Sequence, residues 1–110
     1  MASKNFNFGK LKRSFLTTTL LDGTVLVVNM PKKSTFEKMN ELNNIDEEST
    51  SDTEVYNEIL ELMAEILSNN KGGKKIEADY LEEQGYDIEL VIGFLSEYND
   101  FVKSIRNDPN

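Results

Sequence analysis

The strongest periodic pattern of apolar residues lies near the C-terminus, over Tyr86–Arg106. Apolar residues recur there at alternating intervals of three and four, which is the spacing of one face of a helix. Asp87 precedes the pattern, and its carboxylate can accept an unpaired amide N–H of the first turn. The sequence therefore predicts a long helix that Asp87 caps. Its apolar stripe consists of Ile88, Val91, Leu95, Tyr98, Val102 and Ile105, with Ile92 beside it.

This predicted helix carries more apolar surface than one core-facing side needs. Leu90, Phe94 and Phe101 fall on a flank of the stripe. With them the apolar arc covers roughly 200°, whereas a helix that packs on one side needs only ~100°. Two interpretations remain open. Either the helix is central and covered on two sides, or Leu90, Phe94 and Phe101 form a partner-binding flank for another copy or a helical client.

The N-terminal part of the chain predicts a β-hairpin over residues 10–30. β-Branched and apolar residues surround Asp22-Gly23, a strong signal for a two-residue type I′ turn. Such a turn would pair Thr19 with Leu26 and Thr17 with Val28. Both faces of the hairpin would then be fairly apolar. Because a lone hairpin is marginally stable in water, we expect helices or a strand from another copy to cover it.

Three further helices are expected between the hairpin and the C-terminal helix. Ser34 to Glu37 and Ser51 to Glu54 both match a capping box, which marks the start of a helix. We expect Lys71-Gly72-Gly73 to end the second of these helices by left-handed capping. The predicted segments are a helix over 34–44, an acidic mobile linker over 45–53, a helix to about residue 69 and a short helix over 76–83.

Together these elements predict an α+β fold that is mostly α, with an N-terminal β-hairpin followed by about four helices around one core. Residues 1–9 read as a flexible tail and residues 10–110 as a single domain, with its helical part over 54–106. The second helix should bury a stripe of Tyr56, Ile59, Leu60, Met63, Ile66 and Leu67.

Composition removes most kinds of chemistry. The chain of 110 residues has no Cys and no His, so thiol chemistry, the usual general base and the commonest metal ligands are absent. We expect no enzyme, no cofactor, no metal and, without a long apolar run, no membrane span. The net charge is −8, and Asn40 to Asn110 holds 18 acidic against 5 basic residues. Because phosphate repels acidic surfaces, nucleic acid is not the expected partner.

Gly73-Lys74-Lys75 invites comparison with a phosphate-binding loop. That motif requires a Gly five positions earlier, where Ser68 stands, and a Ser or Thr where Lys75 stands. We therefore interpret this stretch as a basic turn after a helix. The acidic linker likewise lacks the central Gly and the oxygen spacing of a calcium loop.

The order of elements resembles the small tail assembly chaperones of long-tailed bacteriophages, of the type found in phages and prophages of Gram-positive bacteria. The resemblance extends from about Lys10 to Ile105. It is most marked over Asn69 to Ile105, in the turn NNKGGKKI, the short helix with YLEE, and a helix that Tyr86-Asp87 opens and that carries aromatic residues at Phe94, Tyr98 and Phe101.

The resemblance implies a non-enzymatic role in tail assembly. Such chaperones bind the tape measure protein and keep it soluble while the tail tube protein is recruited. They act in the host cytoplasm and are absent from the mature virion. Two alternatives remain open. One is a small acidic regulatory or inhibitor adaptor. The other is a structural tail-completion subunit that uses the hairpin for strand addition.

Overall fold

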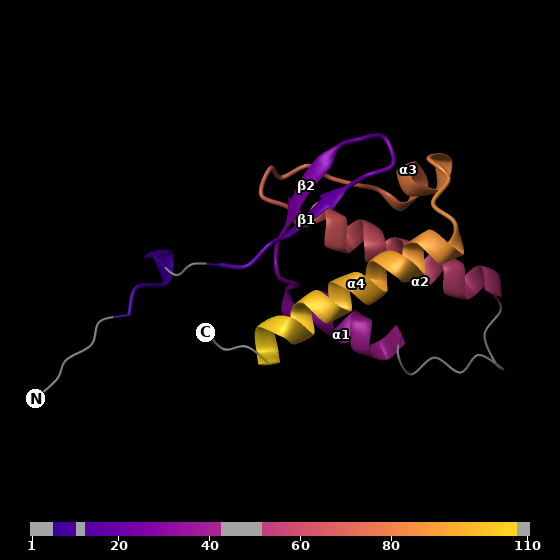
Figure 1. Cartoon of the computed structure of the whole chain (residues 1–110). Helices are drawn as coiled ribbons and strands as arrows, with labels where there is room; N and C mark the ends of the chain where they lie inside the picture. Colours follow the sequence, from indigo (N-terminus) through magenta and orange to yellow (C-terminus); the bar gives the residue numbers. More distant parts are fainter. Residues whose placement is uncertain (1–5, 11–12, 43–51, 108–110) are drawn as a thin grey trace, which may run out of the picture.

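The computed structural model describes residues 6–10, 13–42 and 52–107, and it confirms the predicted fold class (Figure 1). An antiparallel hairpin is followed by four helices, as the sequence predicts. The elements in chain order are a single 3-10 turn η1 (Phe8–Lys10), β1 (Leu16–Thr19), β2 (Val25–Val28), α1 (Lys33–Leu42), α2 (Asp52–Ser68), α3 (Ala78–Glu83) and α4 (Ile88–Asn107).

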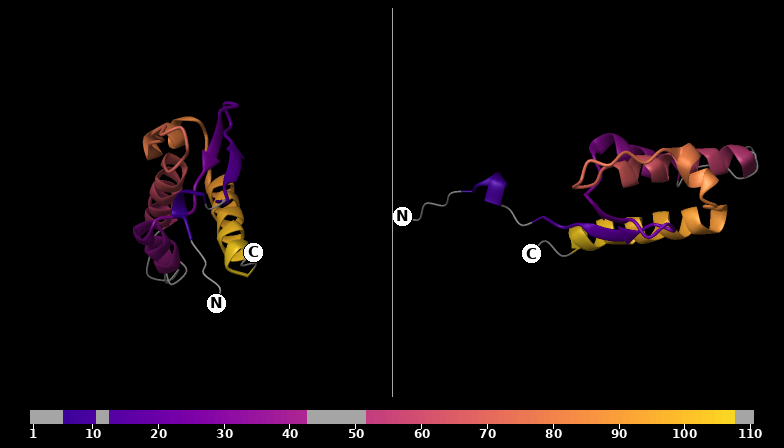
Figure 2. Two further views of the ribbon diagram at one scale, coloured as in Figure 1. Left: turned by 90° about the vertical axis from the view of Figure 1, so that its left-hand side faces the viewer. Right: turned by 90° about the horizontal axis from the view of Figure 1, so that it is seen from above.

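The elements form two layers, which the side and top views separate clearly (Figure 2). One layer holds α4 with the hairpin beside it. The other holds α1, α2 and α3. The core lies between the layers, because each amphipathic helix can bury its apolar stripe only against another element.

The central helix is α2, whereas a central position was one of the two interpretations left open for the C-terminal helix. α2 packs against α1, α3, α4 and β2. The reason is that its apolar arc is wider than the predicted stripe, since Leu62 and the small Ala64 are buried as well. On α4 the stripe is buried only in part: Val91, Tyr98 and Val102 are enclosed, whereas Ile88 is 43% exposed.

The hairpin turn differs from the predicted two-residue turn. Leu20 N–H donates to Thr24 O at 2.8 Å and Gly23 N–H donates to Leu20 O at 2.9 Å, so the loop has three residues. Gly23 has a φ of +92°, a conformation that glycine adopts at little cost. Asp22 Oδ1 also accepts the Thr24 N–H at 2.9 Å. A type I turn followed by a left-handed residue explains this geometry.

The extra loop residue shifts the strand register by one position. Thr18 pairs with Leu26 and Leu16 pairs with Val28, instead of the predicted partners Thr19 and Thr17. A shift of one residue moves a side chain to the opposite face. The buried apolar residues therefore gather on the face toward the core. Val25 and Val27 lie on the other face with Thr17 and Thr19, so both faces carry apolar residues as predicted, but the predicted assignment of residues to faces is wrong. The face toward the core holds Leu16, Thr18, Leu20, Leu26 and Val28, while Thr17, Thr19 and Val25 are exposed.

The chain after α2 also corrects a prediction. α2 ends at Ser68, and the next residues pair with β2 before the glycines are reached. Asn70 forms an antiparallel bridge with Val28. The left-handed residue is Gly73, with a φ of +69°, five positions beyond the end of the helix. Pairing with the sheet therefore ends α2, and left-handed capping by Lys71-Gly72-Gly73 does not.

The helix starts confirm one predicted cap and correct another. Asp87 Oδ1 accepts the Leu90 N–H at 2.9 Å, as the sequence predicts. α1 begins at Lys33, one residue earlier than expected, so Ser34 lies inside the helix and does not cap it. The second predicted capping residue, Ser51, and most of the predicted linker over 45–53 lie outside the described residues, as does most of the predicted tail over 1–9.

Candidate interaction surfaces

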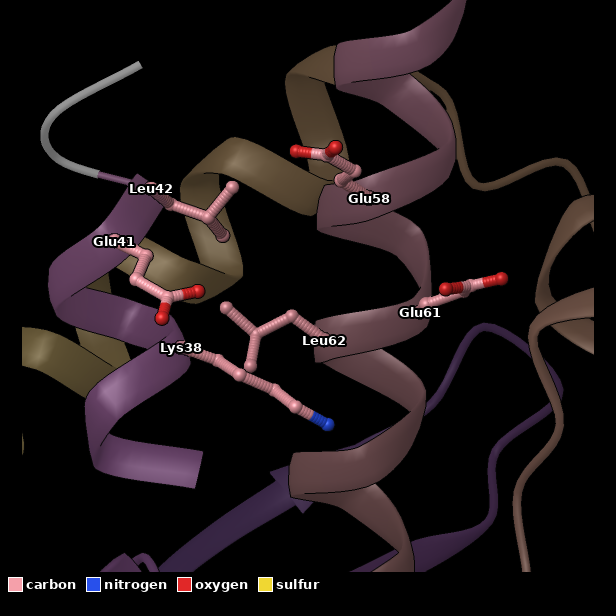
Figure 3. Close-up of a pocket in the computed structure, with 6 residues that line it drawn as sticks. All are labelled: Lys38, Glu41, Leu42, Glu58, Glu61 and Leu62. Atoms are coloured by element: carbon pink, nitrogen blue, oxygen red, sulfur yellow. The ribbon is translucent and has the colours of Figure 1, made fainter. Parts of the chain in front are cut away.

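A groove between α1 and α2 combines acidic side chains with an apolar base (Figure 3). It has a volume of about 350 Å³. Leu42 and Leu62 point toward each other across it, whereas Glu61 points away from α1. Its residues are Lys38, Glu41, Leu42, Glu58, Glu61 and Leu62. The groove is therefore lined by one basic and three acidic residues.

Lys38, the single basic residue of this groove, is already paired. Its Nζ donates to Glu65 Oε1 at 2.9 Å. This hydrogen bond raises the pKa of Lys38 and lowers the pKa of Glu65. The Lys38 side chain is 56% exposed and the Glu65 side chain 36% exposed, so solvent screens the pair and its contribution to stability is small. Because Glu65 compensates the charge of Lys38, the groove is negatively charged through Glu41, Glu58 and Glu61.

A second groove, of about 230 Å³, continues from the first between α1, α2 and α4. The two grooves share Leu42 and Leu62. On the α4 side Ile92 is 53% exposed, which is unusual for an apolar residue beside a core. We call the combined surface the α1/α2/α4 cleft. Its apolar residues are Met39, Leu42, Ile59, Leu62, Ile92 and Leu95.

The predicted partner-binding flank on α4 is divided by the structure. Leu90 is 42% exposed. Phe94 and Phe101 are partly buried against the core, and their ring centroids lie 6.0 Å and 5.9 Å from that of the fully buried Tyr98. Leu90 and Phe94 line one groove together with β1, and Phe101 is not among its lining residues. Partner binding by these three residues stays a prediction.

Sequence reasoning missed the most exposed apolar residue of the α1/α2/α4 cleft. It placed Ile92 beside the core stripe and left Leu62 out of the stripe of α2. The signal for Leu62 was present, because it follows Ile59 by three residues and so lies on a neighbouring part of the helix surface. No local signal marks Ile92 as exposed, since exposure depends on how other elements pack against α4.

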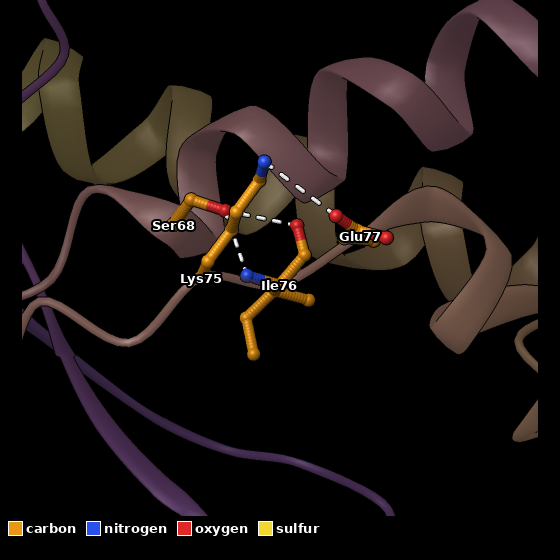
Figure 4. Close-up of polar contacts among 4 residues, drawn as sticks. All are labelled: Ser68, Lys75, Ile76 and Glu77. Atoms are coloured by element: carbon orange, nitrogen blue, oxygen red, sulfur yellow. Dashed lines mark hydrogen bonds and ion pairs between the residues drawn. The ribbon is translucent and has the colours of Figure 1, made fainter.

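The lysine-rich turn after α2 is held by structural contacts (Figure 4). Ser68 Oγ accepts the Ile76 N–H and donates to the Ile76 carbonyl, both at 2.9 Å. Lys75 forms an exposed ion pair with Glu77 at 3.5 Å. The buried Asn70 amide bridges the turn by binding the Lys74 carbonyl at 2.7 Å and the Lys74 N–H at 3.0 Å. The interpretation as a basic turn agrees with this arrangement.

Tyrosine hydroxyls make the most specific polar contacts. Tyr98 donates to Asn29 O at 2.8 Å, and burial raises the pKa of Tyr98. Tyr80 donates to Asp22 Oδ2, which is the main reason that the pKa of Asp22 falls from 3.8 to about 2. Both contacts join the hairpin to a helix. The hydrogen bond between Tyr80 and Asp22 lowers the pKa of Asp22 and raises the pKa of Tyr80, so this carboxylate is a poor base for this hydroxyl, and we interpret both contacts as structural.

Within residues 6–10, 13–42 and 52–107, no group of three His, Cys, Asp or Glu could hold a metal ion. Over the same described segments, every helix is too short or too polar to cross a membrane. Searches against protein families, curated proteins and solved structures returned no match to this chain. The sequence resemblance and the surfaces described above are therefore the basis for a functional proposal.

Proposed function

We propose that this chain is a phage tail assembly chaperone, which binds the tape measure protein without catalysing a reaction and keeps it soluble while tail tube protein is recruited. In this proposal the protein acts in the cytoplasm of the host bacterium and is absent from the finished virion. The sequence resemblance supplies the class of function, and the α1/α2/α4 cleft supplies the surface.

The observation that carries the proposal is the apolar cleft with an acidic edge. An amphipathic helix can lay its apolar stripe into such a groove. Ile92 and Leu62 would contact that stripe, and Glu41 and Glu58 would face basic residues on its sides. A long helical client needs its apolar stripe covered until it is assembled, and a strongly acidic partner helps to keep the complex in solution.

The test is to coexpress the chain with the tape measure protein of the same phage or prophage and to measure the soluble fraction of the tape measure protein. Ile92→Glu should lower that fraction, because it adds a charge in the apolar part of the cleft. Val25→Glu is the matched control, since Val25 is 58% exposed on the outer face of the hairpin. Circular dichroism and melting should show both variants folded.

Two results would overturn the proposal. One is a tape measure protein that is equally soluble with and without the chain. The other is detection of the chain in purified virions, which would favour a structural tail-completion subunit. A soluble fraction that falls equally for both variants would place client binding elsewhere than in the cleft.

A further inference from the structure

The hairpin has one edge that is paired and one that is open. Lys71 N–H donates to Val27 O at 3.0 Å and Asn29 N–H donates to Asn69 O at 2.9 Å, so the residues after α2 occupy the outer edge of β2. Among the described residues, no such partner lies along the outer edge of β1. Unpaired strand edges are templates for pairing with another chain.

The backbone groups on this open edge can be identified from the register. Leu20 exchanges a hydrogen bond with Thr24. In an antiparallel pair, hydrogen-bonded and non-hydrogen-bonded positions alternate, so Thr17 and Thr19 are the non-hydrogen-bonded positions of β1. Their N–H and C=O groups therefore point away from β2. An added strand would bind these four groups.

The open edge borders a shallow groove of about 630 Å³ whose other wall is α4. We call it the β1/α4 groove. Leu90 and Phe94 give this wall an apolar surface, and Glu89 and Glu97 give it negative charge. Gly93 lies between them, and apart from its chain neighbours and the nearby backbone of α4 no atom lies within 4 Å of the position that its Cβ would occupy. The wall is therefore set back where a peptide backbone would pass.

The chain carries a segment that matches this groove. Phe6 and Phe8 are 61% and 79% exposed, and their rings contact each other at a centroid distance of 4.7 Å. Figure 1 shows η1 lying apart from the hairpin and the helices. In an extended segment, residues two apart lie on one face, so both rings can face the same wall. This segment also has no acidic residue, and its flanking bases are Lys4, Lys10, Lys12 and Arg13.

We propose that the segment Phe6–Phe8 of one copy adds as a strand to the β1 edge of a second copy, inside the β1/α4 groove. Phe6 and Phe8 then pack against Leu90 and Phe94. The basic residues around the segment face Glu89 and Glu97. Backbone hydrogen bonds supply the affinity, and the aromatic contacts with the charges supply the specificity.

Docking requires the segment to extend, because Phe8 begins the 3-10 turn η1 in the free chain. The described contact that shapes the segment is local, a hydrogen bond at 2.9 Å from Gly9 N–H to Asn7 Oδ1. If two copies exchange segments reciprocally, the result is a closed dimer. If each copy donates to the next, the result is a chain of copies. The contact is the same in both assemblies, and it is independent of the proposed tape measure binding.

Two variants separate the donor segment from the acceptor groove. Phe6→Ser/Phe8→Ser removes both aromatic anchors at exposed positions, so the fold should not change. Gly93→Arg fills the groove with a long basic side chain, and the space beside Gly93 is open. The change should not destabilise the helix, because every residue except Pro has a higher helix propensity than Gly. Gly93→Ala is the matched control, because it gives a similar helix gain with little filling.

The measurement is mass by light scattering or sedimentation over a wide range of protein concentration. The wild type and Gly93→Ala should self-associate with concentration. The serine double variant and Gly93→Arg should each associate at least about tenfold more weakly. A mixture of these two variants should associate again, because one supplies an intact groove and the other an intact segment.

Three results would overturn the proposal. A wild type that is monomeric throughout would exclude exchange between copies, and would leave the groove to the same chain's own segment or to another protein. Self-association that survives both variants would place the contact elsewhere. Two variants that are each monomeric and stay monomeric when mixed would refute the pairing of segment with groove. Tape measure solubility, measured separately, tests the function and does not bear on this outcome.

Discussion

α2 and α4 are both long amphipathic helices, yet they meet very different surroundings. On α2 the buried residues extend well around the helix, because α1, α3, α4 and β2 all contact it. On α4 the apolar residues Leu90 and Ile92 are about half exposed. Each helix carries more apolar surface than one contact needs. The difference shows that the number of neighbours decides whether such surface becomes core or remains available for binding.

The largest expected effect comes from opening a cavity under α2. Leu67→Ala should lower the free energy of unfolding by about 2–5 kcal/mol, because Leu67 is fully enclosed. Leu90→Ala on α4 should lower it by less than about 1 kcal/mol, since much of that side chain is already in water. Denaturant unfolding measures both values. Equal losses would contradict the difference drawn between the helices.

A smaller effect should follow from Tyr98→Phe, which tests how α4 is attached to the hairpin. The change removes the hydrogen bond to Asn29 O at 2.8 Å while keeping the ring. Leaving this partly buried carbonyl without its partner should reduce the free energy of unfolding by about 1–3 kcal/mol. Thermal or denaturant melting measures the loss. A variant as stable as the wild type would show that water satisfies Asn29 equally well.

Capping of α4 by Asp87 should contribute less to the free energy of unfolding than the Tyr98 hydrogen bond that attaches α4 to the hairpin. Asp87→Ala removes the acceptor of the Leu90 N–H and should reduce the free energy of unfolding by about 0.5–2 kcal/mol. Glu97→Ala, an exposed change within the same helix, is the control and should change stability little. Amide hydrogen exchange in the first turn of α4 should rise in Asp87→Ala alone. Unchanged exchange there would argue against the cap.

The smallest effect concerns Asp22 at the hairpin turn, where the contact comes from α3. Because the pKa of Asp22 is lowered from 3.8 to about 2, its contribution to stability is complete above 3.8 and is lost as the pH falls toward about 2. NMR titration of the carboxyl group should give this low pKa. Tyr80→Phe should raise it toward 3.8. A pKa of Asp22 that is the same in both proteins would remove Tyr80 as its cause.

Local sequence signals predicted the parts of the fold that depend on near neighbours. Asp87 caps α4 because the required amide lies three residues away. Val91 and Tyr98 are buried because their spacing places them on one helix face. The hairpin itself was predicted from Asp22-Gly23, but the register was not. A turn of two residues and a turn of three share this dipeptide, and the core face of the hairpin selects between them.

The parts that could not be predicted depend on distant segments. The bridge between Val28 and Asn70 joins residues far apart in the chain, and nothing near Asn70 marks it as a strand partner. The exposure of Ile92 likewise depends on how the distant helices α1 and α2 pack beside α4. The candidate flank of Leu90, Phe94 and Phe101 was predicted as one surface, whereas β1 borders only its first two residues.

The bridge from β2 to Asn70 also sets an order of events during synthesis. The hairpin leaves the ribosome well before the segment that completes its second edge, and before α2 and α4 can cover its apolar face. A hairpin without such cover is marginally stable. The N-terminal third of the nascent chain therefore forms no stable structure until the later two thirds have been synthesised, so folding is completed only when α4 emerges. Interrupting translation between residues 42 and 52 should release a fragment without stable structure.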